Sequence, residues 1–328
     1  MRSSFSLIEV VETEYTWDFV VARPRDEDLK IRFQELAKKL LRRGLIVRLS
    51  RRGEVAVLQI LRHPLPGPRV SKVLSAVTLL LTLLSVWFSG HLLSESLRGL
   101  LSRPESAGVV GDPLWIDPVV GPLSFTAAIL GILGAHELGH MVAVRAWGGR
   151  WSVPIFIPAG PPLGTFGAVI LSSKPSINRD EVFDTGISGP LAGLIPALAF
   201  SALGILTSFR VPPEVVEAWK ALPESERPSL IAEPVIFIAL RRILGVKETL
   251  LLSPLAFAGL VGVMITFLNL LPAGQLDGGH VFYSLVASRM ARLAALALSV
   301  IVAGVYSPLM ALLVLLLSLR FEHPPPLD

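Results

Sequence analysis

Long apolar stretches, separated by short polar segments, dominate the chain after residue 70. Several of them are as long as the ~20 residues that a helix needs to cross the ~30 Å hydrocarbon core of a bilayer. The predicted spans are 72–93, 120–146, 183–208 and 251–271, with two more inside 280–320 that divide near 304–308. The pattern therefore predicts an α-helical polytopic membrane protein with about six transmembrane helices.

Residues 152–172 are also apolar, but they are not predicted to be helical. Four prolines and three glycines interrupt them, and 165–170 has a strand-like pattern. Non-helical backbone at membrane depth is tolerated only against protein or a water-filled cavity. We therefore expect a re-entrant, β-like hairpin, which either holds an unwound substrate by strand addition or only seals a cavity.

The first 68 residues carry shorter periodicities. They predict a strand at 16–21, a basic amphipathic helix at 26–43 and strands at 45–49 and 54–61. This β-α-β-β order resembles half of a ferredoxin-like fold. We expect a small α+β soluble domain at 1–68, followed by a membrane-embedded domain at 69–328.

Composition and charge narrow the chemistry. Hydrophobic residues make up 52% of the 328 residues and charged residues 17%, below the usual quarter of soluble domains, so the lipid bilayer is an expected partner. The chain has no cysteine, so any metal must be held by His, Asp or Glu. The net charge of +4 is concentrated near the N-terminus, which argues against a nucleic-acid partner. Lys and Arg before the first span and their scarcity in 94–119 predict that both termini are cytoplasmic.

The second predicted span contains the sequence His136-Glu137-Leu138-Gly139-His140. Histidines four residues apart share one face of a helix, so both imidazoles can reach one metal ion, and Glu137 is placed to take a proton from water. Two histidines and a glutamate are costly in an apolar helix unless they serve a function. The competing interpretation is a hydrogen-bonded histidine pair with a neutral glutamic acid.

A catalytic zinc site usually has a third protein ligand, and Asp277 is the candidate. It follows the fourth span in a segment where prolines and glycines break the helix. His136 lies about 24 Å along its helix, toward the cytoplasmic end to which the fourth span also returns. Asp-Gly is equally a common turn pair, so the residues alone leave open whether Asp277 is a ligand or a turn residue.

The pattern His136-Glu137-x-x-His140 together with Asn269-x-x-Pro272-x-x-x-Leu276-Asp277-Gly278 resembles the site-2 protease family of intramembrane zinc metalloproteases. The segments 164–168 and 189–193 are similar to forms found in members of that family. The resemblance covers about 120–286, the expected catalytic core, and is weak outside it.

The resemblance implies one zinc ion per chain, ligated by His136, His140 and Asp277, with Glu137 as general base and acid. Asn269 would help to hold the substrate carbonyl, although by itself it predicts only an interhelical hydrogen bond. The implied activity is cleavage of transmembrane protein substrates within or near the membrane, in regulated intramembrane proteolysis. The N-terminal domain either binds a regulator or the cytoplasmic segment of a substrate, or only adds solubility.

We expect structural roles for two features near the predicted zinc ligands. His280 is expected to support the site rather than to ligate the metal, and Gly189 with Gly193 is expected to serve close helix packing. The rival functions are a zinc transporter, a metalloprotease whose site lies outside the lipid (with Glu181 as the acidic candidate) and an inactive scaffold.

Overall fold

The computed structural model describes most of the chain. The described residues are 7–12, 16–21, 26–41, 43, 45–52, 55–62, 70–170, 176, 178–228, 234–274, 276–286, 288–306, 311–312 and 314–315. Residues 63–68, whose three prolines and one glycine predict a stiff linker, lie outside them.

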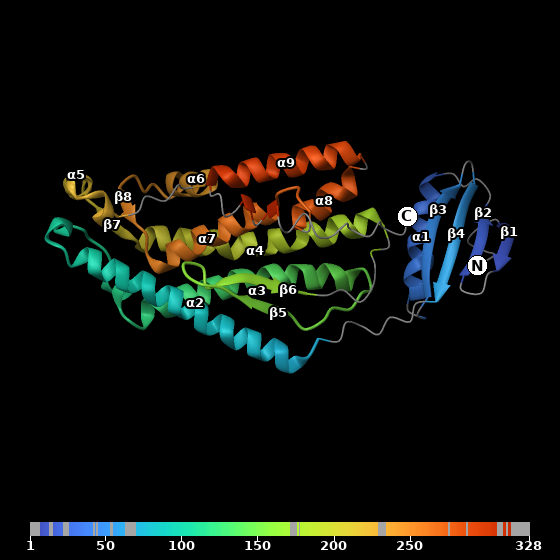
Figure 1. Ribbon diagram of the computed structural model, residues 1–328, viewed down its shortest axis with the longest axis horizontal. Coiled ribbons are helices and arrows are strands. Elements are labelled where there is room, and N and C mark those ends of the chain that lie inside the picture. Colours follow the sequence, from blue (N-terminus) through green and yellow to red (C-terminus); the bar gives the residue numbers. More distant parts are fainter. Residues whose placement is uncertain are drawn as a thin grey trace.

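A bundle of helices forms the larger part of the molecule (Figure 1). Among the described residues, three helices are long and apolar enough to cross a membrane. They are α2 (Lys72–Leu101), α3 (Val120–Ala146) and α4 (Arg179–Thr207). Helix α7 (Pro254–Asn269) and the stretch Met290–Val305 of α9 (Arg289–Tyr306) are apolar but shorter.

Side-chain caps explain where three of these helices begin. Ser71, Asn178 and Ser253 each accept a hydrogen bond from a backbone amide three residues later, which satisfies a donor that the first helical turn leaves free. The spans are therefore delimited by local polar residues as well as by the ends of the apolar runs.

The predicted spans agree with these helices unevenly. The prediction 120–146 matches α3. Helix α2 continues past the predicted end at 93 to Leu101, and α4 begins at Arg179, before the predicted start at 183, and ends at Thr207. The prediction 251–271 began too early, because Leu251 belongs to a strand and Ser253 caps α7. The region after 280 also starts differently: a short helix, α8 (Asp277–Leu285), precedes α9, which begins at Arg289. The predicted division near 304–308 lies partly outside the described residues, since α9 continues to Tyr306 and 307–310 are not described. The count of six crossings stays a prediction.

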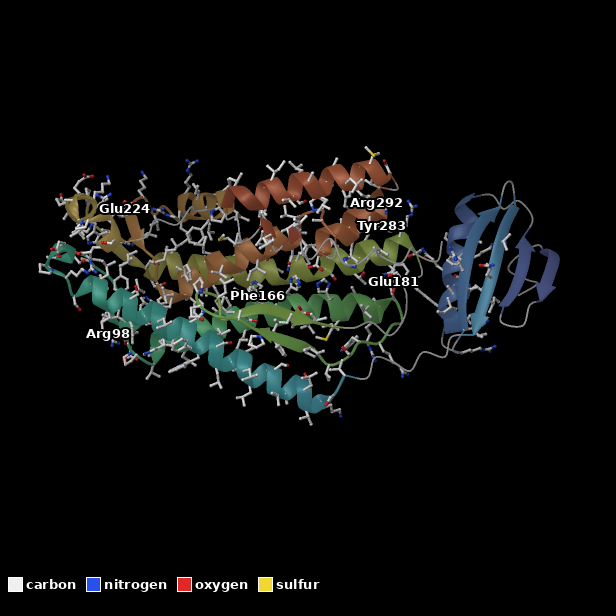
Figure 2. The ribbon with its side chains drawn as sticks, in the orientation of Figure 1. Arg98, Phe166, Glu181, Glu224, Tyr283 and Arg292 are labelled. Carbon is white, nitrogen blue, oxygen red and sulfur yellow. The ribbon has the colours of Figure 1, made fainter. Side chains whose placement is uncertain are left out.

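The expected hairpin is present beside the bundle. Strand β5 (Ile155–Pro158) pairs antiparallel with β6 (Thr165–Val169). Helix α2 holds it: Ser85 Oγ donates to the carbonyl of Gly164 at 2.6 Å, and Ser75 Oγ donates to that of Pro154 at 2.5 Å. Phe166 of β6 is 62% exposed and lies between the two ends of the bundle (Figure 2).

The end of the bundle formed by the C-termini of α2 and α4 carries a small cap, which we call the distal cap (residues 98–119 and 208–253). Its described residues include three short 3₁₀ helices: η1 (Pro104–Ser106), η2 (Pro113–Ile116) and η3 (Glu224–Glu226). Strands β7 (Phe209–Val211) and β8 (Thr249–Leu251) pair antiparallel, beside helices α5 (Pro213–Ala221) and α6 (Val235–Ile243). Arg98 and Glu224 lie at this end, and Glu181 and Arg292 lie toward the other (Figure 2).

The N-terminal segment folds around a four-stranded antiparallel sheet of order β1-β2-β4-β3. Its elements are β1 (Leu7–Glu12), β2 (Thr16–Val21), α1 (Asp26–Leu41), β3 (Leu45–Arg52) and β4 (Val55–Arg62). The sequence analysis missed β1, so the predicted β-α-β-β order is corrected to ββαββ. Phe33, Leu36 and Leu40 of α1 are buried, as the helical periodicity predicted.

Candidate metal centre

Helix α3 presents two histidines on one face. His136 is 7% exposed and His140 lies four residues later, so both imidazoles point toward α4. Glycines allow the two helices to approach: a Cβ at Gly139 would lie 2.4 Å from the carbonyl oxygen of Ser188. The histidines therefore lie where α3 and α4 approach each other closely.

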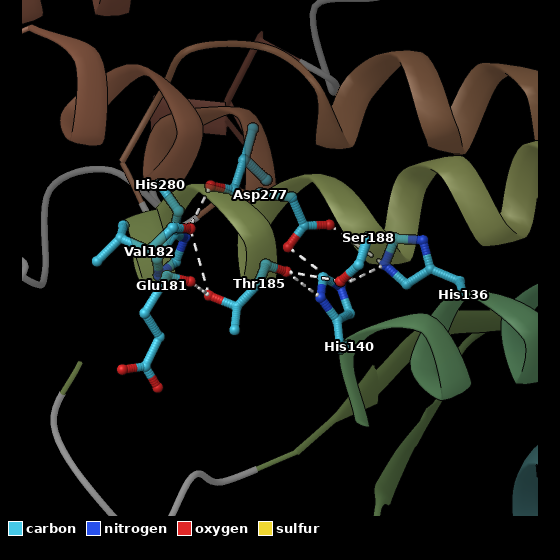
Figure 3. Close-up of polar contacts among 9 residues, drawn as sticks. His136, His140, Glu181, Val182, Thr185, Ser188, Asp277 and His280 are labelled. Carbon is cyan, nitrogen blue, oxygen red and sulfur yellow. Dashed lines mark hydrogen bonds and ion pairs between the residues drawn. The ribbon is translucent and has the colours of Figure 1, made fainter. Parts of the chain in front are cut away.

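The third candidate ligand comes from the turn between α7 and α8. A Cβ at Gly278 would lie 2.1 Å from the carbonyl oxygen of Leu270, and one at Gly279 would lie 2.3 Å from that of Gly274. The turn therefore needs both glycines. It places Asp277 in the first turn of α8, where its side chain points toward the histidines instead of capping the helix (Figure 3).

His136, His140 and Asp277 form one compact group. The two Nε2 atoms are 3.1 Å apart, Asp277 Oδ2 lies 3.2 Å from His136 Nε2, and Asp277 Oδ1 lies 3.3 Å from His140 Nε2. Among the described residues, these three form a group that could hold a metal ion, with all ligand atoms within 4.8 Å of one another. Two ligands at 2.0–2.1 Å from a tetrahedral zinc ion would be separated by about 3.3 Å, so the observed spacing fits zinc.

The hydrogen bonding of His140 also favours coordination of a cation by its Nε2 atom. Its Nδ1 lies 2.7 Å from the carbonyl oxygen of Thr185, and because a carbonyl only accepts, Nδ1 carries the hydrogen. A neutral ring then turns its Nε2 lone pair toward His136 and Asp277. Metal-ligating histidines generally make this kind of second hydrogen bond, which fixes the tautomer and the ring orientation.

Glu137 and Asn269 occupy different positions relative to this group. Glu137 is partly buried beside the ligands and interacts electrostatically with His136, His140 and Asp277. Asn269 is the last residue of α7 and partly buried, eight residues before Asp277. The catalytic roles expected for both stay predictions. His280 Nδ1 donates to the carbonyl of Leu276 within α8, in keeping with a supporting position.

The structure adds residues that the sequence analysis did not connect to the site. The glycines of α4 face the histidines: a Cβ at Gly189 would lie 2.1 Å from His140 Nε2, and one at Gly193 would lie 3.0 Å from His136 Cβ. A Cβ at Gly186 would lie 3.0 Å from the backbone oxygen of Asp277. The four-residue glycine spacing predicted close packing, and the structure shows that the packed groups are the candidate ligands themselves.

Comparison with curated proteins gives relatives that match part of the chain. "Probable zinc metalloprotease EGY2, chloroplastic" of Oryza sativa subsp. indica is 29% identical over 193 residues, which is 54% of this chain and 32% of that protein. "Probable zinc metalloprotease EGY1, chloroplastic" is 29% identical in Arabidopsis thaliana and 30% identical in Oryza sativa subsp. japonica; each alignment covers 66% of this chain, and 40% and 38% of the respective relative. The chain thus spans about a third to two fifths of the length of these relatives. No solved structure gives a significant match.

A family profile also matches the chain and shows which residues are matched. The profile of Peptidase family M50 matches residues 124–315, which is more than half of the chain. The matched region begins four residues into α3 and includes both histidines, the hairpin, α4 and Asp277. Because the match contains every element that builds the metal centre, the chain belongs to Peptidase family M50, the site-2 protease family of membrane-embedded metalloproteases.

Proposed function

We propose that this chain is a zinc-dependent intramembrane endopeptidase that hydrolyses peptide bonds within or near the transmembrane helices of membrane-tethered proteins. The observation that carries the proposal is the convergence of His136, His140 and Asp277 at spacings that fit zinc, with Glu137 beside them. Two of these ligands lie on α3, a helix long and apolar enough to cross a bilayer. The reaction is therefore expected at membrane depth.

In this proposal His136, His140 and Asp277 hold one zinc ion. Zinc supplies Lewis acidity, which polarises a carbonyl group and lowers the pKa of water. Glu137 takes a proton from the attacking water and delivers it to the nitrogen of the leaving amine, so that the amide bond breaks as the new carboxyl group forms. Asn269 holds the substrate carbonyl, as polar amides do in other hydrolases.

The position of the centre along α3 supports cleavage toward one side of the membrane. His136 lies ten residues, or about 15 Å, before the end of α3 at Ala146, on the side that also bears the start of α4. The lysines and arginines of the N-terminal domain favour the cytoplasm for this side. We infer six crossings, cytoplasmic termini and release of a cytoplasmic fragment, as in regulated intramembrane proteolysis.

A zinc transporter is the less favoured function. Transport would require ligand sets at successive depths along the helices. In the part of the chain that the structure describes, the candidate ligands form a group at one depth. This arrangement suits a reaction centre better than a conduction path.

The N-terminal domain is proposed to receive the cytoplasmic segment of a substrate or a regulator. Two contacts of α1 support a position at the end of α3 and the start of α4: Lys38 Nζ lies 4.4 Å from the centroid of the Trp147 ring, and Gln34 Nε2 donates to Asp180 Oδ2 at 3.3 Å. Trp147 follows the end of α3, and Asp180 lies in the first turn of α4. Lys38→Ala, with Lys39→Ala as the matched control, should slow cleavage of a substrate with a long cytoplasmic segment and spare one without it. Equal rates for both substrates would refute this role.

The proposed reaction is tested by cleavage of a tagged single-span substrate in detergent. We expect cleavage by the native protein, and loss of cleavage both in Glu137→Gln and after treatment with a zinc chelator. Glu137→Gln should retain zinc, since it is not a ligand. If Glu137→Gln cuts as well as the native protein, the proposed chemistry is wrong.

A further inference from the structure

Among the described residues, helix α6 of the distal cap packs against the bundle through the face that carries Phe237, Leu240 and Leu244. Phe237 is fully buried in a cluster with Ile205 of α4 and Leu260 of α7, and Leu240 and Leu244 pack against the same cluster. Ile205 lies two residues before the end of α4, and Leu260 six residues after the start of α7. At 1.5 Å per residue, α6 is therefore anchored within about 10 Å of the distal ends of these helices. Figure 1 shows it beside the distal part of the bundle.

The opposite face of α6 is apolar for most of its length and then basic. Residues at i, i+3, i+4 and i+7 share one face of a helix, and this face carries Val235, Ile238, Ala239 and Arg242. Val235 is 81% exposed and Ile238 is 38% exposed. An exposed apolar stripe that ends in an arginine matches a bilayer surface, with hydrocarbon along the stripe and the charge at headgroup level.

The turn after α6 adds a second source of positive charge. Gly245 has φ +71°, and the amides of Gly245 and Val246 donate to the carbonyls of Arg242 and Arg241. This is the Schellman pattern, which reverses the chain after a helix. The turn brings Lys247 back beside the last turn of α6. The end of the helix and the segment that follows it therefore both contribute cations to the same part of the surface.

These cations line an open surface cavity of about 480 Å³. Among the described residues, its lining includes Arg241, Arg242 and Lys247, with Ile238, Gly245 and Val246. Among the described residues, Glu248 is an acid next to this cavity: the Lys247 amide donates to it at 3.1 Å, and Arg210 and Arg241 lie close enough to attract it. In this described part of the chain, one carboxylate beside three lining cations leaves an excess of positive charge.

A purely structural role accounts for only part of this arrangement. Cations in the last turn of a helix interact favourably with its dipole, and the Arg241 side chain donates to the carbonyl of Glu248 at 2.6 Å. Neither explanation applies to Lys247, which follows the turn. Nor does either explain why Arg242 continues the exposed apolar stripe.

We propose that this cavity binds the phosphate group of an anionic phospholipid, whose acyl chain lies along Val235 and Ile238 of α6. Arg242 and Lys247 contact the phosphate from the two sides of the turn, and Arg241 adds to the positive field. Charge complementarity selects an anionic headgroup, and the apolar stripe selects a lipid over a free anion. Binding would fix the distal ends of α4 and α7 at the level of the headgroups.

The test is lipid binding to the purified full chain in mild detergent, with phosphatidylglycerol, phosphatidylcholine and inorganic phosphate as separate probes. Bound lipid is counted by native mass spectrometry, and the shift in thermal unfolding gives the apparent affinity. We expect retention of phosphatidylglycerol over phosphatidylcholine. Arg242→Gln/Lys247→Gln should weaken it ~30-fold, because each basic residue near an anionic surface contributes about a factor of five.

Two further variants distinguish lipid binding at this cavity from a general effect of positive charge on the distal cap. Arg103→Gln/Lys220→Gln removes the same charge from the distal cap outside the cavity and should bind like the native protein. Arg242→Lys/Lys247→Arg keeps both charges and should bind within a few-fold of it. The proposal is overturned if the cavity variant binds phosphatidylglycerol like the native protein, if the control variant loses as much, or if inorganic phosphate alone gives the same stabilisation.

Discussion

Gly189 offers a sharp test of the metal centre, because a single methyl group there would collide with a candidate ligand. An ideal Cβ at Gly189 lies 2.1 Å from His140 Nε2, whereas ordinary contacts begin at 3.4 Å. In Gly189→Ala the imidazole must therefore retreat by about 1.3 Å, or α4 must move away from α3. Since a zinc–nitrogen bond is only 2.0–2.1 Å long, a displacement of this size removes His140 from the coordination sphere.

The expected loss of zinc affinity in Gly189→Ala is at least ~100-fold, the upper end of what changes around metal ligands usually cost. Overpacking between the two helices should also destabilise the fold by about 1–3 kcal/mol. Zinc affinity is measured by competition with a chromogenic chelator in detergent, and cleavage of a single-span substrate is measured in parallel.

Gly134→Ala is the matched control for Gly189→Ala. Gly134 lies on α3 two residues before His136, and a Cβ there would meet nothing within 4 Å. This variant should bind zinc like the native protein and gain up to ~1 kcal/mol of helix stability. If Gly189→Ala binds zinc within twofold of the native value, the described approach of α4 to His140 is wrong.

Three other predictions follow from single contacts. Asp277→Asn removes the negative charge from the group and should lower zinc affinity at least ~10-fold, measured as zinc per chain after dialysis against a chelator. Gly164→Ala should destabilise the protein by ~2–4 kcal/mol in thermal unfolding, because Gly164 has φ +78° and a Cβ there would lie 2.4 Å from Val86 Cα. The backbone amides of Val120 and Val119 donate to Asp117, which holds the pKa of that carboxyl below its usual value. Its stabilising effect is therefore present above pH ~4 and is lost as the pH falls further, so the stability difference between native and Asp117→Ala should shrink at pH 3.

The sequence predicted the long apolar helices and the hairpin well, because length and proline content decide these features locally. The limits of α3 were predicted correctly, and β6 ends one residue before the predicted end of that strand, at 169 instead of 170. The distal cap was missed: α5, α6, β7 and β8 are short, and their pairing depends on residues far apart in the chain, such as Phe209 and Leu251. Strand β1 was missed for the same reason, since it is defined by its partner β2.

The candidate ligands could be named from the sequence, but not their surroundings. His136 and His140 follow from helical spacing alone. Asp277 was ambiguous between a ligand and a turn residue until the structure placed it 3.2 Å and 3.3 Å from the two imidazoles. The carbonyl of Thr185 and the glycine face of α4 were not predictable, since a backbone acceptor carries no sequence signal and a glycine pair indicates packing without naming what is packed.

The central claim, hydrolysis inside the membrane, is tested most directly by locating the cut. A single-span substrate is incubated with the native protein in a bilayer of known thickness in ¹⁸O-labelled water, and the fragments are identified by mass spectrometry. The proposed function predicts one new C-terminus within the apolar span, carrying a single ¹⁸O atom, and no such fragment with Glu137→Gln. A cut confined to the water-exposed segments of the substrate, or an identical fragment from Glu137→Gln, would contradict it.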